Sequence, residues 1–476
     1  MDNQPSKRRV IVLGAGPTGL SCAWQLVHAG FTVTVLEKRE EVGGHGGTYT
    51  IHGYNVDEGP HKLYPQVPCA KPMIDRFVGK DLLTMSKTSQ VYINGRYMNY
   101  PFGIGDLFGA LGFTTGLKCG LSFASGKFKS FFRRQDRTYT DFVHRHFGAY
   151  THHLVFKEVA EKLWGNPDEL DVQLAKTRII APSIIELLKG LFFGFKGKPK
   201  LSADEFYYPR YGLRQLWRAM QKDIEKEGGT VITQALPTLV RRNPSGTFSV
   251  FYVREDKNYE VEADVLVSTI PVSIIYELFD PAPSSEAMQA VSALKLSSLY
   301  ILYLVVDTPR LLKVNWIFFP ESKYHYARIS EQKGFSEEMV PKDRTVLTVE
   351  IPAARAHIGK KAKENQEALK DEVIDQLKEV GILQAHHRVL DAFFNYSSSI
   401  YPIYDLEFKN NLARVLEYSD SIPNFYLNGR LGLFCYNNMD HSMEMGTLLG
   451  DHIARDNIIA QWQKLRETFY EYKIVD

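Results

Sequence analysis

Residues 9–37 (RVIVLGAGPTGLSCAWQLVHAGFTVTVLE) decide the fold of this chain. Residues 9–13 are a short, β-branched apolar run, which predicts a buried parallel strand. A GxGxxG motif follows at once, and residues 20–30 have helical apolar spacing that ends at a glycine. Residues 31–36 predict a second strand, which ends at Glu37. This order of strand, glycine turn, helix and strand predicts an α/β nucleotide-binding unit.

Each part of this stretch has a physical role in holding a dinucleotide. Gly14 permits the tight turn, Gly16 lets the backbone approach a pyrophosphate, and Gly19 lets the helix pack closely on the strand. The helix N-terminus offers N–H groups and a positive dipole end to the phosphates. Glu37 has the spacing of an acid that accepts hydrogen bonds from ribose hydroxyls, and its charge disfavours a 2′-phosphate.

Further motifs along the chain identify a family. A second glycine cluster (KREEVGGHGGT) occupies residues 38–48, and YNVDEGPH follows at residues 54–61. Residues 424–432 (NFYLNGRLG) predict a last strand and a Gly-Arg turn, and a helix is expected to begin near Asp440. In this order the motifs resemble the flavin amine oxidase superfamily, which includes protoporphyrinogen oxidases, monoamine oxidases, phytoene desaturases and UDP-galactopyranose mutases.

The resemblance implies an α/β fold with FAD as the cofactor. The expected architecture is a three-layer, Rossmann-like FAD/NAD(P)-binding domain with an inserted α+β substrate domain. A third segment, with residues 228–232 (GGTVI) and 263–271 (ADVLVSTIP), lies between the N-terminal and C-terminal motifs, so the FAD-binding domain must be discontinuous. The expected FAD-binding domain comprises residues 1–75, 205–285 and 395–476, and the substrate-binding domain, with a helical part and an antiparallel sheet, comprises residues 76–204 and 286–394. Within these domains, residues 137–222 are predicted to be mainly helical.

The resemblance also assigns cofactor contacts to residues of this chain. In relatives the position of Val231 contacts adenine through the main chain, the position of His61 lies beside the flavin ring, and a Gly-Arg turn contacts the pyrophosphate. The helix near Asp440 would direct N–H groups at the flavin pyrimidine edge, where they stabilise reduced flavin. The predicted cofactor-binding residues are Gly14, Gly16, Pro17, Thr18, Gly19, Glu37, Lys38, Gly43, Gly44, His45, Gly46, Thr48, His61, Val231, Thr269, Gly429, Arg430, Asn438, Met439 and Asp440.

Two reactions are open within this superfamily. In the one we favour, an FAD-dependent oxidoreductase of the protoporphyrinogen oxidase and amine oxidase group transfers hydride from the substrate to flavin N5 in an aromatic-lined pocket. In the alternative, a UDP-galactopyranose mutase-like isomerase uses reduced flavin N5 as a nucleophile on a nucleotide sugar, and arginines and tyrosines hold the diphosphate. A flavin-binding protein without turnover is a third reading.

Among the candidate arginines for these reactions, only Arg178, Arg210 and Arg430 lie within motif-like segments. The predicted catalytic residues are His61, Tyr436 and Arg430, the predicted substrate-binding residues are Arg178, Arg210, Tyr401 and Tyr436, and Arg214 and Arg328 are further candidates for a diphosphate site. The expected partner is a small-molecule substrate: a nucleotide sugar, an amine or a porphyrinogen.

The composition narrows the class of protein further. The 57 Lys and Arg against 55 Asp and Glu give a net charge of +2, which does not favour a nucleic-acid partner. The four cysteines form no CxxC pair and have no histidines at metal-ligand spacing, so we predict a reduced, cytoplasmic protein without a metal site. Residues 184–200 (IIELLKGLFFGFKGKPK) could form a peripheral membrane contact.

Aromatic residues make up 12% of the chain, which is a high share. The segments expected to line or roof the flavin pocket contain many of them: Trp164, Tyr208, Trp217, Tyr300, Tyr303, Trp316, Phe318, Tyr324, Tyr401, Tyr404 and Tyr436.

Overall fold

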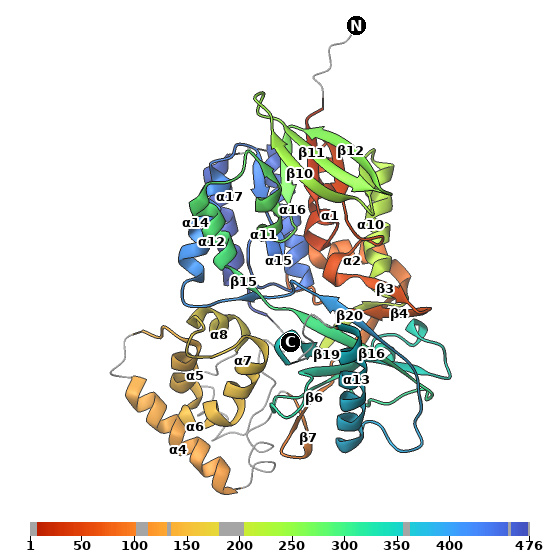
Figure 1. Ribbon diagram of the computed structural model, residues 1–476, viewed down its shortest axis with the longest axis vertical. Coiled ribbons are helices and arrows are strands. Elements are labelled where there is room, and N and C mark those ends of the chain that lie inside the picture. The colour runs from red at the N-terminus through yellow and green to blue at the C-terminus, as the bar shows by residue number, and fades with distance from the viewer. Residues whose placement is uncertain are drawn as a thin grey trace. The chain divides into compact units, whose positions relative to one another are not determined.

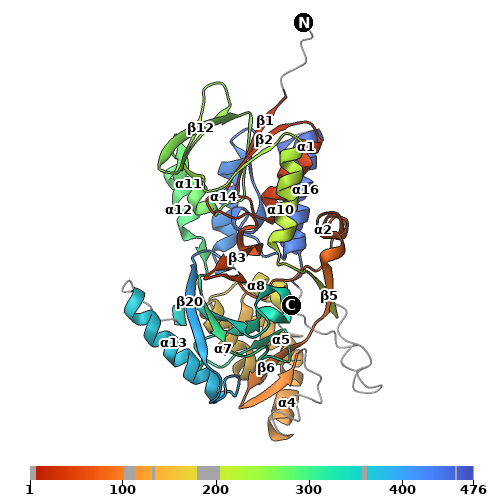
Figure 2. The same ribbon diagram turned by 90° about the vertical axis from the view of Figure 1, so that its right-hand side faces the viewer.

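The chain divides into two units in the computed structural model, which describes residues 7–100, 113–130, 135–179, 204–355, 362–455 and 458–474 (Figure 1, Figure 2). Unit 1 comprises residues 1–83, 207–295 and 407–474, and unit 2 comprises residues 84–206, 296–406 and 475–476. Three separated stretches of sequence therefore build unit 1, and the stretches between them build most of unit 2.

A five-stranded parallel sheet forms the centre of unit 1. Its order is β22-β13-β1-β2-β9, with β1 at Arg9–Leu13, β2 at Thr32–Leu36, β9 at Thr230–Ile232, β13 at Val265–Ser268 and β22 at Phe425–Leu427. The side chains of Val10 to Leu13 are fully buried, as expected for a parallel strand that is covered on both faces. Because β1 lies between β2 and β13, the glycine turn after β1 leaves from the middle of the sheet.

Helices α1 (Pro17–His28), α10 (Arg214–Lys226) and α16 (Met439–Arg455) pack together in unit 1. Helices α1 and α16 approach each other closely because α16 carries glycines where the two helices meet. A Cβ atom on Gly446 would lie only 2.2 Å from the carbonyl oxygen of Thr18. This close packing fixes the N-terminal end of α1 against the last long helix of the sequence.

The remaining elements of unit 1 surround this centre. They are β3 (Thr48–Ile51), β4 (Tyr54–Asp57), α2 (Ala70–Val78), β10 (Leu236–Arg242), β11 (Phe248–Arg254), β12 (Lys257–Ala263), α11 (Val272–Leu278), β14 (Phe279–Asp280), α12 (Ser285–Ala293), α14 (Phe408–Asp420), α15 (Gly429–Gly432) and α17 (Ile459–Glu467). Strands β12, β11, β10 and β14 form a second sheet, and β3 and β4 form a hairpin.

Unit 2 contains a seven-stranded, mainly antiparallel sheet and a helical part. The sheet has the order β20-β16-β19-β18-β17-β6-β7, with β6 at Ser89–Ile93, β7 at Arg96–Asn99, β16 at Leu299–Val306, β17 at Trp316–Phe318, β18 at Arg328–Glu331, β19 at Thr345–Pro352 and β20 at Val389–Ser397. The described helices are α4 (Phe113–Ser130), α5 (Tyr139–Phe147), α6 (Ala149–Thr151), a π-helical turn at His152–Phe156, α7 (Lys157–Leu163), α8 (Val172–Arg178) and α13 (Ala362–Glu379). Short strands β5 (Leu82–Ser86), β8 (Glu205–Pro209), β15 (Lys295–Leu296) and β21 (Pro402–Ile403) lie at or near the unit boundaries.

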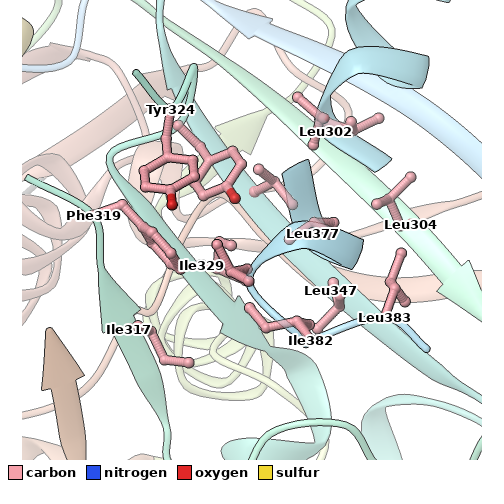
Figure 3. Packing of buried hydrophobic residues seen from close by; sticks show 14 of the residues in the cluster. Leu302, Leu304, Ile317, Phe319, Tyr324, Ile329, Leu347, Leu377, Ile382 and Leu383 are labelled. Carbon is pink, nitrogen blue, oxygen red and sulfur yellow. The ribbon is translucent and has the colours of Figure 1, made fainter. Parts of the chain in front are cut away.

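One face of the unit 2 sheet packs against α13 and forms a hydrophobic core (Figure 3). Phe319 and Tyr324 belong to this core, and their rings meet edge to face with centroids 5.4 Å apart. The prediction that Tyr324 lines the flavin pocket is therefore wrong, because its ring packs in the core with α13.

The helical prediction for residues 137–222 is confirmed by α5 to α8 and by α10 within the described residues. It is wrong for Glu205–Pro209, which forms β8. Residues 184–200, the predicted membrane contact, lie outside the described residues. Among the helices that are described, none is long and apolar enough to cross a membrane.

Candidate functional site

The glycine turn after β1 is held by hydrogen bonds to two neighbouring segments. The Gly14 N–H donates to the carbonyl oxygen of Leu36 at 2.8 Å, and the Ala15 N–H donates to Oε2 of Glu37 at 2.8 Å. The second carboxylate oxygen of Glu37 accepts the Arg39 N–H at 2.9 Å. Each carboxylate oxygen can accept a further hydrogen bond, so the predicted role of Glu37 toward a ribose hydroxyl is compatible with these contacts.

The first turn of α1 presents N–H groups and no capping side chain. Gly16 is the N-cap residue and has extended backbone angles, and Pro17, which has no N–H, occupies the first helical position. The N–H groups of Thr18 and Gly19 belong to the first turn, where a helix has no carbonyl partners of its own. This arrangement suits a phosphate, which would accept these hydrogen bonds at the positive end of the helix dipole.

The second glycine cluster crosses the first at backbone contact. The Gly43 N–H donates to the carbonyl oxygen of Ala15 at 2.8 Å, and a Cβ atom on Gly44 would lie 3.2 Å from the Cα atom of Gly16. Gly43 and Gly44 both have positive φ, +114° and +52°. The backbones of these two glycine-rich segments therefore pass each other at a distance that larger side chains would prevent.

The third predicted segment meets the same place in unit 1. Gly429, with φ +78°, lies against Thr18, since a Cβ atom there would be 3.0 Å from the Thr18 hydroxyl oxygen. Met439, at the start of α16, contacts the second cluster, since a Cβ atom on Gly46 would be 2.8 Å from the Met439 sulfur. The structure therefore brings the two glycine clusters and the C-terminal segment together around the N-terminus of α1.

Two buried aromatic residues hold the second glycine cluster and the hairpin after it. The Trp217 Nε1–H donates to the carbonyl oxygen of Gly46 at 2.7 Å. The Tyr208 hydroxyl donates to Asp57 at 2.6 Å, and the Thr48 hydroxyl donates to the other oxygen of Asp57 at 2.5 Å. The predictions placed Tyr208 and Trp217 at a pocket wall and did not assign Asp57. The aspartate within the YNVDEGPH motif was the available signal for Asp57.

Burial raises the pKa of Asp57 to about 7, although hydrogen bonds from Thr48 and Tyr208 act in the opposite direction. Folded protein therefore keeps a proton that the unfolded chain releases near pH 4, and the stability contributed by this group falls as the pH rises from about 4 to 7. We expect Asp57→Asn to reduce this decline, measured as the urea midpoint at several pH values. Asp75→Asn, at an exposed carboxylate of the same unit, is the control. Equal pH slopes for wild type and Asp57→Asn would contradict the assignment.

His45 has a protein partner in the second cluster. Its Nδ1 lies 2.9 Å from Oε2 of Glu58, whose other oxygen accepts a hydrogen bond from Arg39 at 2.9 Å. Burial alone would raise the pKa of Glu58, but the hydrogen bond from His45 and the charge of Arg39 lower it to about 2. This contact orients the imidazole ring of His45. The cofactor contact of His45 stays a prediction.

The N-terminal end of α16 carries a buried carboxylate. Asp440 accepts the Gln66 N–H through Oδ2 at 3.0 Å, whereas its Oδ1 has no hydrogen-bond partner within the described part of the chain. Burial raises the pKa of Asp440 to about 6. An unsatisfied buried oxygen marks a place where a bound group or water can supply a donor, so the predicted cofactor role of Asp440 fits this position.

The other residues of the α16 terminus are fixed by local contacts. His441 Nδ1 accepts the Asn438 N–H at 3.1 Å, and the His441 ring stacks on Tyr472 with centroids 4.1 Å apart. Burial lowers the pKa of His441 to about 4, and the positive charge of Arg430 contributes to the same shift. Arg430 donates through Nη2 to the carbonyl oxygen of Asn437 at 2.7 Å.

The remaining predicted residues are spread over both units. Thr269 donates to the carbonyl oxygen of Leu13 at 2.9 Å. In unit 1, Lys38 is exposed, His61 is half-buried and Tyr436 is buried. Val231 lies in β9, and the Arg210 N–H donates to the carbonyl oxygen of Asp81. In unit 2, Arg178 ends α8, and the carbonyl oxygen of Tyr401 accepts the Ser297 N–H. The predicted substrate residues therefore do not all come from one unit.

Two of the arginines suggested for a diphosphate site, Arg214 and Arg328, are bound to protein groups. Arg328 makes a bidentate pair with Glu350 in unit 2, at 2.8 and 2.9 Å. Arg214 donates to Thr50 at 2.7 Å and also to Asn55. These contacts occupy planar guanidinium donors that a diphosphate would otherwise accept from.

The sheet face of unit 2 opposite α13 is partly polar. Ile329 packs in the core, so its neighbours Arg328 and Ser330 point to the other face. There Gln332 donates to the Thr348 hydroxyl at 2.8 Å. The Ser330 hydroxyl and Oε1 of Gln332 are buried and have no hydrogen-bond partner among the residues described. These two buried oxygens are therefore the polar atoms of this face that still need a hydrogen-bond donor.

These features define a dinucleotide-binding protein whose N-terminal glycine turn, second glycine cluster and C-terminal helix meet in one unit. The model of the flavin-containing amine oxidoreductase family matches residues 17–430, and the chain belongs to this family. The resemblance and fold class predicted from the sequence are confirmed, and the protein is a flavin-dependent oxidoreductase.

Relatives and solved structures agree with this family at low identity. The 4,4′-diapolycopene oxygenase of Methylomonas sp is 22% identical, over 97% of this chain and 100% of that protein. An L-amino-acid oxidase of Crotalus adamanteus is 37% identical over 90 residues, 19% of this chain and 17% of that protein.

Among solved structures, reduced UDP-galactopyranose mutase has a TM-score of 0.81 at 17% identity and covers 99% of this chain and 98% of its own. A protein assigned as a protoporphyrinogen oxidase, from Exiguobacterium sp. 255-15, has a TM-score of 0.72 at 17% identity, over 95% of this chain and 99% of its own. At these identities the two structures establish the shared fold.

Proposed function

We propose that the protein binds FAD in unit 1 and oxidises a small-molecule substrate by two electrons. The observation that carries the proposal is the meeting of the two glycine clusters with the distant C-terminal segment at the N-terminus of α1. Gly44 crosses Gly16, Gly429 lies on Thr18, and Met439 contacts Gly46. An extended cofactor with a pyrophosphate in its middle needs such a set of glycine-rich backbone surfaces.

The residues of this unit have separate roles in the proposal. The first turn of α1 binds the pyrophosphate through backbone N–H groups, and Glu37 accepts hydrogen bonds from the ribose of the adenosine half. The N-terminal end of α16, with Asp440, faces the ring end of the cofactor. Bound flavin supplies the two-electron acceptor for the substrate.

Two observations favour oxidation over the mutase reaction. The guanidinium groups of Arg214 and Arg328 are bound to protein partners, which supports a site without a diphosphate clamp. The sequence match to an oxygenase over nearly the whole chain also supports an oxidation rather than an isomerisation. The likeness to the mutase structure extends to the fold alone.

The polar face of unit 2 bears on the substrate class. Ser330 and Gln332 each keep an unsatisfied buried oxygen on this face, which favours a substrate that carries hydrogen-bond donors. An amine is one such molecule, and it fits the family to which the chain belongs.

The cofactor is tested by releasing it from purified protein by denaturation and separating it by chromatography. FAD at about one molecule per chain is the expected result. FMN, or no flavin after incubation with excess FAD, would overturn this part of the proposal.

The reaction is tested separately, with oxidised protein mixed anaerobically with primary amines, porphyrinogens or UDP-galactopyranose. Bleaching of the flavin absorbance by one of the first two classes is the expected result. Conversion of the nucleotide sugar only after reduction by dithionite, with no bleaching by any oxidisable substrate, would instead establish the mutase reaction.

A further inference from the structure

Helix α4 of unit 2 packs through small residues. It lies beside α5 and α6 (Figure 1). Ser122 accepts the Tyr150 N–H at 2.8 Å, and a Cβ atom on Gly126 would lie 2.3 Å from the carbonyl oxygen of His144. Cys119 is buried on the same side of the helix. The packed side of α4 is therefore made mainly of small residues, with Phe123 half-buried beside them.

Three large apolar side chains of α4 point to solvent. Leu117 is 51% exposed, Leu121 is 65% exposed and Phe128 is 71% exposed. Thr114 and Ala124, which complete the same helical stripe, are also exposed. A helix in a globular protein ordinarily buries its large apolar stripe and exposes its small and polar residues. In α4 the stripe of Leu117, Leu121 and Phe128 faces solvent instead, so it needs a different explanation from core packing.

The stretch of sequence that contains α4 carries charge of one sign. Between Asp106 and Asp136 the sequence has five basic residues and no acidic one: Lys118, Lys127, Lys129, Arg133 and Arg134. Lys118 is exposed beside the stripe. An apolar helical stripe with basic residues is the composition of a helix that lies in the interface of an anionic bilayer. A second copy of this chain would bring the same positive charges together, which disfavours self-association through this face.

We propose that α4 is a membrane-surface helix that places Leu117, Leu121 and Phe128 into the headgroup boundary of an anionic lipid bilayer. The helix lies along the surface, because it is not long and apolar enough to span. Its back face is fixed by the close contacts of Ser122 and Gly126, so the stripe is already exposed before it meets a membrane. The proposal is independent of the reaction at the flavin.

Co-sedimentation of the flavin-loaded protein with lipid vesicles tests this. We expect binding to vesicles of phosphatidylcholine with about one third phosphatidylserine, and much weaker binding to phosphatidylcholine alone or at high salt. The triple change Leu117→Ser, Leu121→Ser and Phe128→Ser should lower the partition coefficient by about 100-fold. Lys118→Glu should lower it by about 10-fold and weaken the dependence on phosphatidylserine.

A matched pair of single variants separates this stripe from general surface hydrophobicity. Leu121→Ser should reduce vesicle binding, whereas Leu390→Ser, at an exposed leucine of β20 in the same unit, should not. All variants should keep wild-type flavin content and thermal midpoint, because the changed side chains are exposed. Absence of binding to anionic vesicles, or equal losses in the two leucine variants, would overturn the proposal. Self-association through the stripe would also overturn the proposal. It would appear as a molecular mass that rises with protein concentration in the wild type and stays constant in Leu121→Ser.

Discussion

Gly16→Val is expected to abolish flavin binding without unfolding the protein. The backbone angles of Gly16 are extended, so valine can adopt them, and a Cβ atom there meets only the Gly44 Cα atom, at 4.0 Å. The side chain would instead project toward the space that a pyrophosphate needs. Loss of two charge-assisted hydrogen bonds to the phosphates, at ~1.5–3 kcal/mol each, weakens binding by about 100-fold or more.

The measurement is the flavin content after gel filtration, with titration of FAD into apoprotein as the quantitative form. Gly120→Val is the matched control, since its Cβ atom would meet nothing within 4 Å and its position is on α4. A substitution of Gly19 would not test flavin binding, because a Cβ atom there would lie 1.9 Å from the Gly14 carbonyl oxygen and disturb the fold. Full flavin occupancy in Gly16→Val would show that the cofactor lies elsewhere.

Trp217→Ala is expected to cost stability and flavin affinity together. The ring is fully buried, and its Nε1–H holds the Gly46 carbonyl oxygen. It also lies tightly on Gly43, where a Cβ atom would be 2.5 Å from the ring. Truncation of a buried tryptophan costs ~3–5 kcal/mol of unfolding free energy. The second glycine cluster then loses its support, and we expect flavin affinity to fall by about 10-fold or more.

Trp462→Ala separates the two effects. Trp462 is equally buried in unit 1, on α17, and packs on Tyr426 and Phe469. Its truncation should lower the unfolding free energy by a similar amount and leave the flavin affinity of the folded protein unchanged. The measurements are urea unfolding curves and FAD titrations below the unfolding transition. A similar loss of flavin affinity in both variants would contradict the specific role of Trp217.

Other features of the site could not be predicted from the sequence. The contacts of Trp217 with Gly46 and of Tyr208 with Asp57 join residues more than 150 positions apart. No local pattern distinguishes an aromatic residue that holds a glycine cluster from one that lines a pocket. For the same reason Tyr324 was placed at the pocket although it packs in the core of unit 2.

The sequence by itself determined the first strand, turn and helix, the family and the class of cofactor. It could do so because Gly14, Gly16, Gly19 and Glu37 act through local backbone geometry, and their spacing is set by the elements that carry them. Only the tertiary structure decided which distant residues support that local motif and which face of α4 is exposed. Burial and hydrogen-bond partners depend on the surroundings of a side chain, and these arise only when separate segments pack together.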